Sequence, residues 1–234
     1  MQYQVSRALA GPLLKALARP RVTGAEHIPA TGGAVMASNH LSIVDSIYLP
    51  LMLDRPVTFA AKSEYFTGTR PIDRIAGAYL RATKQLAVDR AGPRAAQDML
   101  QAALSLMQQG QLFGIYPEGT RSPDGRLYRG RIGVGWLALN SGLPVIPVAM
   151  KGTERVLPPG RIVPHPARIE IIIGKPLTFG SEYQRGPEAK ARRAITDEVM
   201  QAIQELSGQE YVAIYASTRK EELAAASANG GAAR

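Results

Sequence analysis

The chain has 234 residues, 45% of them hydrophobic and 20% charged, which is typical of a folded globular protein and excludes an intrinsically disordered one. Its 28 Lys and Arg outnumber 19 Asp and Glu, and the net charge of +9 favours anionic partners: phospholipid headgroups, nucleotide-bearing cofactors, acidic carrier proteins or nucleic acid. The absence of cysteine excludes disulfides, thiolate metal sites and a covalent thioester to the protein.

The first predicted element is a helix over residues 2–18, in which an apolar residue recurs at every fourth position from Val5 to Leu17 with basic residues between. A basic amphipathic helix of this kind lies in a membrane interface or docks on its own domain, and Pro12 weakens both interpretations. No secretory signal is predicted, and no membrane span either, because the longest uncharged run, 132–150, is interrupted by Asn, Gly and Pro.

Strands and helices alternate along the rest of the chain. Apolar runs predict strands within 32–39, 57–62, 84–88, 111–119, 144–150 and 168–174. Helical spacing predicts helices at 42–53, 70–80, 93–110, around Trp136 and at 187–206. This alternation predicts an α/β fold: a single domain with a mixed, largely parallel sheet flanked by helices. The predicted divisions are an N-terminal helix that could contact a membrane (1–20), the domain itself (21–216) and a disordered tail (217–234).

Polar residues follow several of these strands, and functional groups of such folds collect at strand ends. The first cluster is SNHLSIVDS (38–46). Ser42 and Asp45 alone predict a capping box at the start of a helix. His40 adds a second hypothesis, in which Asp45 turns back, holds one imidazole nitrogen and leaves the other free to accept a proton. The two interpretations are compatible.

The second cluster is YPEGTRS (116–122), which follows a strongly apolar strand. Pro-Glu-Gly is common in surface turns. However, Gly119 permits close backbone approach, Thr120 and Ser122 offer hydroxyls, and Arg121 offers a planar fork, which together suit a phosphate monoester. Positive charge continues along the same loop with Arg126, Arg129 and Arg131.

The third cluster is VDR (88–90), between a predicted strand and a predicted helix. An Asp-Arg pair at such a junction is usually a structural ion pair. The alternative is that Arg90 is a further phosphate ligand.

In this order, NHLSIVD (39–45), AVDR (87–90), YPEGTRS (116–122) and LPVIPVAM (143–150) resemble the four sequence blocks of the glycerolipid acyltransferase family, and most of all its 1-acylglycerol-3-phosphate acyltransferases. The resemblance runs from about Arg21 to Lys175. The chain departs from the family at Ala87, where a bulky aromatic residue is usual. Its N-terminus also lacks the longer hydrophobic helices of many bacterial members, which suggests looser membrane attachment.

The resemblance implies a glycerol-3-phosphate acyltransferase-like fold and the transfer of a fatty acyl group from acyl-CoA or acyl carrier protein to lysophosphatidate, giving phosphatidate in phospholipid biosynthesis. His40 would be the general base and Asp45 would orient it. Arg121 would bind the acceptor phosphate. The other predicted contributors to that phosphate site are Glu118, Gly119, Thr120, Arg90 and Lys62. No metal and no cofactor beyond the acyl thioester co-substrate is implied.

Two alternatives remain open. The acceptor could be another lyso-lipid or glycerol 3-phosphate, or the chain could be a basic lipid- or nucleic-acid-binding protein without activity. Nucleic acid is disfavoured because only 6% of residues are aromatic and no aromatic-basic interleaving is present. The predicted partners are therefore a lysophospholipid, an acyl thioester and a membrane surface, with a peripheral location on the cytoplasmic side of the cell membrane. No oligomeric state is predicted.

Overall fold

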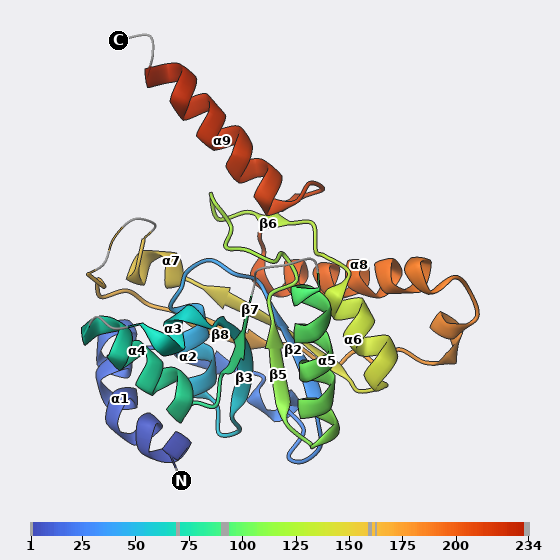
Figure 1. The fold of residues 1–234 in the computed structure, drawn as a ribbon, viewed down its shortest axis with the longest axis horizontal. Helices are drawn as coiled ribbons and strands as arrows, with labels where there is room; N and C mark the ends of the chain where they lie inside the picture. Colours follow the sequence, from blue (N-terminus) through green and yellow to red (C-terminus); the bar gives the residue numbers. More distant parts are fainter. Residues whose placement is uncertain (1, 69–70, 90–93, 159–160, 162, 232–234) are drawn as a thin grey trace.

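The computed structural model describes residues 2–68, 71–89, 94–158, 161 and 163–231. Within these residues a seven-stranded sheet has the order β1-β8-β7-β2-β5-β3-β4 (Figure 1). Its strands are β1 (Arg21–Thr23), β2 (Ala34–Ser38), β3 (Val57–Lys62), β4 (Leu86–Val88), β5 (Leu112–Ile115), β7 (Val145–Lys151) and β8 (Glu170–Ile173).

Five of these strands, β7, β2, β5, β3 and β4, are mutually parallel, and β7 pairs with β8 in antiparallel orientation. The prediction of a mixed, largely parallel sheet is therefore confirmed. Every residue of β2 is buried, which explains its continuous apolar sequence, because a strand in such a sheet is covered on both faces. The carboxyl ends of the five parallel strands meet at one edge of the sheet.

Helices cover both faces of the sheet (Figure 1). The longer ones are α1 (Gln2–Ala18), α2 (Asp45–Met52), α4 (Pro71–Ala82), α5 (Ala95–Gln108), α6 (Gly133–Ser141), α8 (Glu188–Ser207) and α9 (Ala216–Gly231). Shorter helices are α3 (Glu64–Thr67), α7 (Thr153–Val156) and the 3-10 turns Ala25–His27 and Ser181–Gln184.

The side chains of β2 alternate between two hydrophobic layers, as the two-residue period of a strand requires. Met36 packs in the layer that contains Tyr48 of α2, whereas Val35 and Ala37 pack in the layer formed with α5, α6 and α8. The end of α1 docks on the first layer, where Ala18 is fully buried and the Tyr48 hydroxyl donates to the Leu14 carbonyl (3.1 Å). For residues 11–18 the structure therefore shows the docked alternative, and membrane contact by α1 stays a prediction.

The prediction of a disordered tail is wrong for residues 217–231, which belong to α9. The helix contains several Ala together with Lys220, Glu221 and Glu222, residue types that favour helix formation, and the first residue of α9, Ala216, is fully buried against the domain. Beyond that anchor α9 extends away from the rest of the chain (Figure 1). None of the helices in the described ranges combines the length and the apolar character needed to cross a bilayer.

The sequence also gave no sign of a small parallel pairing between β6 (Leu127–Tyr128) and β9 (Tyr211–Val212). Strands of two residues have no measurable periodicity, so they form only because a distant segment supplies the hydrogen-bonding partner. This pairing fixes the loop that follows β5 and the segment that leads into α9, and both lie next to the residues described below.

Candidate active site

The first and third sequence blocks meet at the carboxyl edge of the sheet. His40 follows β2, and Tyr116–Ser122 follow the neighbouring β5. Two hydrogen bonds join these loops directly: the Ser122 N–H donates to the His40 carbonyl (2.7 Å), and the His40 N–H donates to a carboxylate oxygen of Glu118 (3.2 Å). The two segments, far apart in sequence, therefore form one unit.

Asp45 holds His40 through one oxygen. His40 Nδ1 lies 2.8 Å from Asp45 Oδ2, and the same oxygen accepts the backbone N–H groups of Leu41 (2.7 Å) and Ser42 (2.8 Å). Asp45 is fully buried, while the His40 side chain is 15% exposed. With Nδ1 donating to the carboxylate, Nε2 is the ring nitrogen left to accept a proton. The predicted contact between His40 and Asp45 is present, whereas the catalytic role stays a prediction.

The predicted capping box is only half formed. Asp45 accepts the Ser42 N–H, as the acidic partner of such a box does, but the Ser42 hydroxyl donates to the Leu157 carbonyl (3.0 Å). The helix α2 begins at Asp45, with Val44 preceding it. Ser42 is therefore not the cap, because its hydroxyl is used by a chain segment that only the tertiary structure brings close.

Tyr116 packs against one face of the His40 imidazole, a contact that the sequence did not reveal. Its ring stacks on that of His40 with centroids 3.8 Å apart and planes 8° apart, and the Phe59 ring also stacks on Tyr116, with centroids 5.0 Å apart. The Tyr116 hydroxyl shares a 2.9 Å hydrogen bond with Ser46. Burial raises the pKa of Tyr116 well above its ordinary value, so the phenol stays neutral. The only sequence signal was an aromatic residue at the end of β5.

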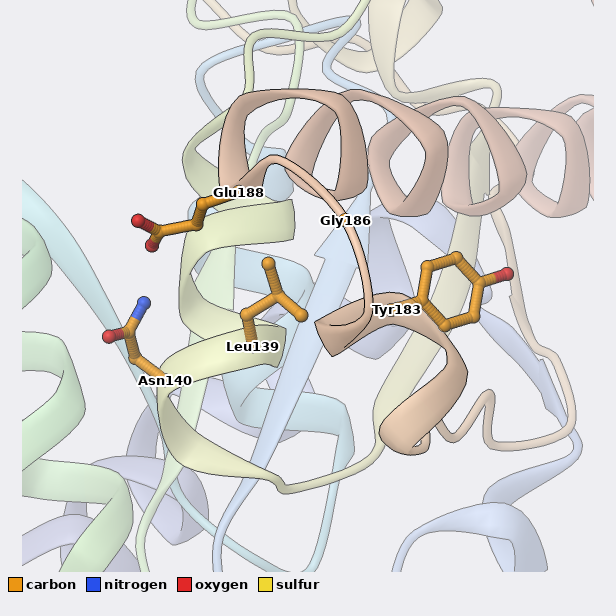
Figure 2. Close-up of a pocket in the computed structure, with 5 residues that line it drawn as sticks. All are labelled: Leu139, Asn140, Tyr183, Gly186 and Glu188. Carbon is orange, nitrogen blue, oxygen red and sulfur yellow. The ribbon is translucent and has the colours of Figure 1, made fainter.

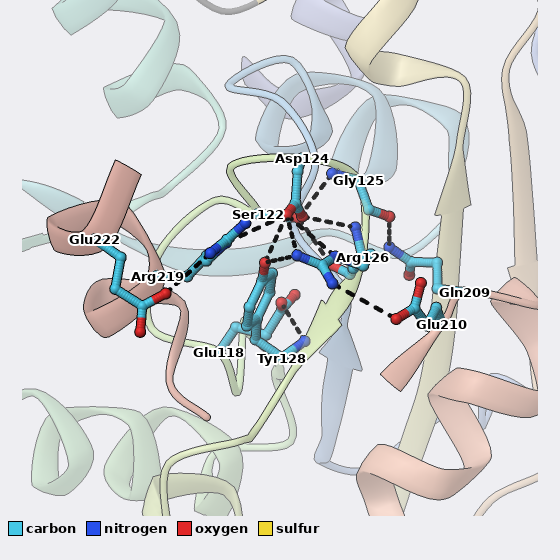
Figure 3. Close-up of polar contacts among 10 residues, drawn as sticks. All are labelled: Glu118, Ser122, Asp124, Gly125, Arg126, Tyr128, Gln209, Glu210, Arg219 and Glu222. Carbon is cyan, nitrogen blue, oxygen red and sulfur yellow. Dashed lines mark hydrogen bonds and ion pairs between the residues drawn. The ribbon is translucent and has the colours of Figure 1, made fainter. Parts of the chain in front are cut away.

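Glu118 is an internal support and not a surface ligand. It is only 1% exposed, and its two oxygens accept the N–H groups of His40 and Tyr128, the latter at 2.9 Å (Figure 3). Burial raises its pKa to about 7, against the opposing effect of these two hydrogen bonds. The contribution of Glu118 to the phosphate site stays a prediction, and with both oxygens bonded internally its carboxylate would act there by holding the loop.

The predicted turn after β5 is closed by a hydrogen bond from the Gly119 N–H to the Tyr116 carbonyl (2.9 Å). Gly119 has φ of +74°, a conformation that glycine adopts readily. The side chain of Arg131 lies against it, so that an added Cβ would come within 2.9 Å of Arg131 Cδ. Thr120 Oγ1 accepts a 2.6 Å hydrogen bond from Lys220 of α9, and Arg121 is exposed beside it.

The arginines after this turn do not all remain available to an anion. Arg126 pairs with Asp124 (2.7 Å), which also accepts the Tyr128 hydroxyl proton (2.8 Å), and Figure 3 shows this network. Arg129 and Arg131 lie over the Tyr215 ring, 5.6 and 5.0 Å from its centroid. The predicted concentration of positive charge on this loop is therefore partly neutralised at Arg126.

The two remaining predicted residues are placed differently. Lys62 ends β3 at the same sheet edge and pairs with Glu64 (2.6 Å), on a half-exposed surface. Arg90 lies outside the described residues. Among the residues that the structure describes, no three His, Cys, Asp or Glu side chains gather as a metal site would require.

Asn39 ties the loop that carries His40 to the fourth block. Its side-chain oxygen accepts the Met150 N–H (2.7 Å), and its amide nitrogen donates to the Met150 carbonyl (3.0 Å). A further bond reaches Gln209 (2.7 Å), near β9. An amide is required here because one side chain must both donate and accept. The fourth block thus fixes the position of the residue that immediately precedes His40.

A shallow depression of about 310 Å³ lies elsewhere, between the end of α6 and the start of α8 (Figure 2). It is lined by Leu139, Asn140, Tyr183, Gly186 and Glu188. Its lining contains no histidine and no group of basic residues, so the sheet edge around His40 remains the candidate active site.

The chain is similar to several known proteins. A chloroplastic 1-acyl-sn-glycerol-3-phosphate acyltransferase from Brassica napus is 32% identical over 164 residues, which cover 69% of this chain and 45% of the relative. An enzyme of the same name from Bacillus subtilis is 29% identical over 188 residues, covering 80% of this chain and 87% of the relative. The chain thus spans less than half the length of the plant relative.

The crystal structure of a 1-acyl-sn-glycerophosphate acyltransferase from Thermotoga maritima is similar, with a TM-score of 0.66 and 25% identity, over 87% of this chain and 79% of that one. Residues 19–151 match the family model described as Acyltransferase. That match spans more than half of the chain and includes all four sequence blocks, so the resemblance is confirmed and the chain belongs to the acyltransferase family.

Proposed function

We propose that the chain transfers a fatty acyl group from an acyl thioester to the free hydroxyl of lysophosphatidate, giving phosphatidate for phospholipid biosynthesis. The observation that carries the proposal is the 2.8 Å contact between His40 and Asp45, with the exposed guanidinium of Arg121 in the loop bonded to it. A base beside a cation suits an acceptor that carries both a hydroxyl and a phosphate. The names of the relatives in Brassica napus and Bacillus subtilis support this acceptor.

The chemistry requires one proton to move twice. His40 Nε2 takes the proton of the acceptor hydroxyl as its oxygen forms a bond to the thioester carbonyl carbon. The tetrahedral intermediate then collapses, the carbon–sulfur bond breaks, and the leaving thiolate takes the proton from His40. Asp45 keeps Nδ1 protonated throughout and stabilises the imidazolium between the two steps. Direct transfer in one ternary complex is the simplest scheme for a chain without cysteine.

The proposed donor is an acyl thioester, either acyl-CoA or acyl carrier protein. Acyl-CoA and acyl carrier protein present the same thioester and are both anionic, which suits a chain of net charge +9. A peripheral position on the cytoplasmic face of a membrane, where lysophosphatidate is presented, completes the proposal.

The test follows thiol release from palmitoyl-CoA with a chromogenic reagent, with lysophosphatidate or glycerol 3-phosphate as acceptor. Because the chain has no cysteine, the protein contributes no background signal. His40→Ala is expected to lower the rate by about 10²- to 10⁴-fold, the usual contribution of a general base, without loss of folding. His165→Ala, which removes an exposed histidine, is the matched control and is expected to leave the rate unchanged.

Thiol release that requires both lysophosphatidate and His40, with phosphatidate as product, would support the proposal. Release without any acceptor, unchanged in His40→Ala, would indicate a hydrolase and contradict it. Acylation of glycerol 3-phosphate in preference to lysophosphatidate would keep the base and replace the acceptor.

A further inference from the structure

The start of α9 is anchored to the loop that follows β5. Ala216 is fully buried, and the Arg131 guanidinium donates to the Ser217 hydroxyl (3.1 Å). Arg219 lies 3.9 Å from Asp124 and pairs with Glu222 (3.0 Å). These contacts hold the first turns of α9 against the loop that follows β5, at the end of the helix that Figure 1 shows nearest to the domain.

Lys220 reaches the third block from this anchored turn. It lies three residues after Ser217, so both side chains share one face of the helix. Its ammonium group donates to Thr120 Oγ1 at 2.6 Å and is partly buried there. The contact joins residues that are 100 positions apart in the sequence. Thr120 is the residue between Gly119 and Arg121, in the middle of the predicted phosphate cradle.

Three cations therefore surround this short turn: Arg121, Arg131 and Lys220. In the described ranges none of them forms an ion pair with a carboxylate; Arg126 and Arg219, in contrast, are paired. Burial lowers the pKa of Lys220, and the nearby Arg121 lowers it further. Glu118 opposes that effect weakly, and its own carboxyl, with a pKa of about 7, is already bonded to two backbone N–H groups. Like charges gathered without a counter-ion favour binding of an anion.

We propose that Lys220 completes the binding site for the acceptor's phosphate monoester together with Thr120 and Arg121. The proposal rests on the proposed function and adds to it a ligand from α9. A phosphate monoester carries up to two negative charges and three terminal oxygens, which match an ammonium group, a hydroxyl and a guanidinium fork. When phosphate binds, the Lys220 ammonium keeps its position and exchanges or shares its bond to Thr120 with a phosphate oxygen.

The first test compares steady-state kinetics of Lys220→Met with the wild type. Loss of one charge-assisted hydrogen bond is expected to raise the KM for lysophosphatidate by about 10- to 100-fold, while kcat changes little. Lys220→Arg is expected to restore part of the affinity. Lys190→Met, which removes the same charge from the exposed surface of α8, is the matched control and is expected to behave as the wild type. With monoacylglycerol, which lacks the phosphate, Lys220→Met and the wild type are expected to react at equal rates.

A second measurement is independent of activity. Inorganic phosphate is expected to raise the Tm of the wild type and of Lys190→Met, and to raise that of Lys220→Met much less. If the wild type does not acylate lysophosphatidate but shows this difference in Tm, the proposed function fails and the phosphate site stands.

Three results would overturn the proposal. The first is a wild-type KM and a wild-type response to phosphate in Lys220→Met. The second is a KM raised for acyl-CoA alone, which would assign Lys220 to a phosphate of the donor. The third is an equal loss of rate with monoacylglycerol and lysophosphatidate, which would mean that Lys220 only anchors α9.

Discussion

The buried carboxylate of Asp45 is bonded asymmetrically. Oδ2 receives donors from His40, Leu41 and Ser42, whereas Oδ1 is buried and has no hydrogen-bond partner within the described residues. All of the orienting interactions therefore converge on the atom that holds the imidazole. This arrangement fixes the ring in its plane, and the stacked ring of Tyr116 fixes the face on which it rests. If His40 acts as the proposed general base, this positioning lets it lose little entropy when an acceptor binds.

Glu118 gives a prediction about pH. Its pKa of about 7 in the folded protein lies above the ordinary glutamate value of 4.5, so the folded protein binds this proton more tightly than the unfolded chain does. The contribution of the protonated Glu118 carboxyl to the free energy of unfolding is complete below pH 4.5 and is lost as the pH rises through about 7. It corresponds to a loss on the order of 3 kcal/mol in the free energy of unfolding.

Denaturant unfolding from pH 4.5 to 8 measures this effect. Glu118→Gln removes the titrating group and is expected to flatten the decline, while lowering stability overall because its amide offers one acceptor to two N–H donors. An equally steep decline in Glu118→Gln would show that another group is responsible.

At the scale of elements, α6 and α8 cross at Gly135. A Cβ added there would overlap the backbone carbonyl of Arg192 and would lie 2.9 Å from Thr196 Oγ1. Only glycine allows the two helices to approach this closely. The α6–α8 pair in turn buries Val134, Leu137 and Ile195 in the layer that supports β2, and so it holds one side of the strand that leads to His40.

Gly135→Ala is expected to lower the free energy of unfolding by about 1–3 kcal/mol, the usual effect of overpacking. Gly133→Ala is the matched control, because its nearest contact would be an ordinary 3.5 Å from a Leu100 methyl group. The control is expected to be neutral or slightly stabilising, since alanine favours helix more than glycine does. Urea unfolding of both variants checks the difference, and equal stabilities would contradict the close crossing.

At the scale of the whole molecule, the net charge of +9 gives a prediction about membranes. A cationic surface gathers near anionic lipids, and salt screens this attraction. The chain is expected to sediment with vesicles of phosphatidylglycerol at low salt, to dissociate at high salt, and to bind phosphatidylcholine vesicles weakly. Binding that salt does not weaken, or that is equal for the two lipids, would contradict an electrostatic attachment.

Much of the architecture follows from local patterns in the chain. The run at 57–62 is β3 at the predicted bounds, and the helix predicted at 93–110 is α5, Ala95–Gln108. Helical spacing was sufficient there because this signal acts within one element. β6 and β9 were not predicted, and the segment of α9 was predicted to be disordered. Both failures have the same cause: the stability of these elements depends on partners that are distant in the sequence.

The candidate site divides in the same way. The sequence by itself determined the acyltransferase family, the α/β class and the spacing between His40 and Asp45, because motif order and short-range geometry are written into consecutive residues. Only the tertiary structure decided that Tyr116 stacks on His40, that Glu118 faces inward and that Lys220 reaches Thr120. These contacts depend on where the carboxyl ends of parallel strands meet and on how α9 docks. Both are determined by the packing of segments that are distant in the sequence, and no local sequence pattern encodes them.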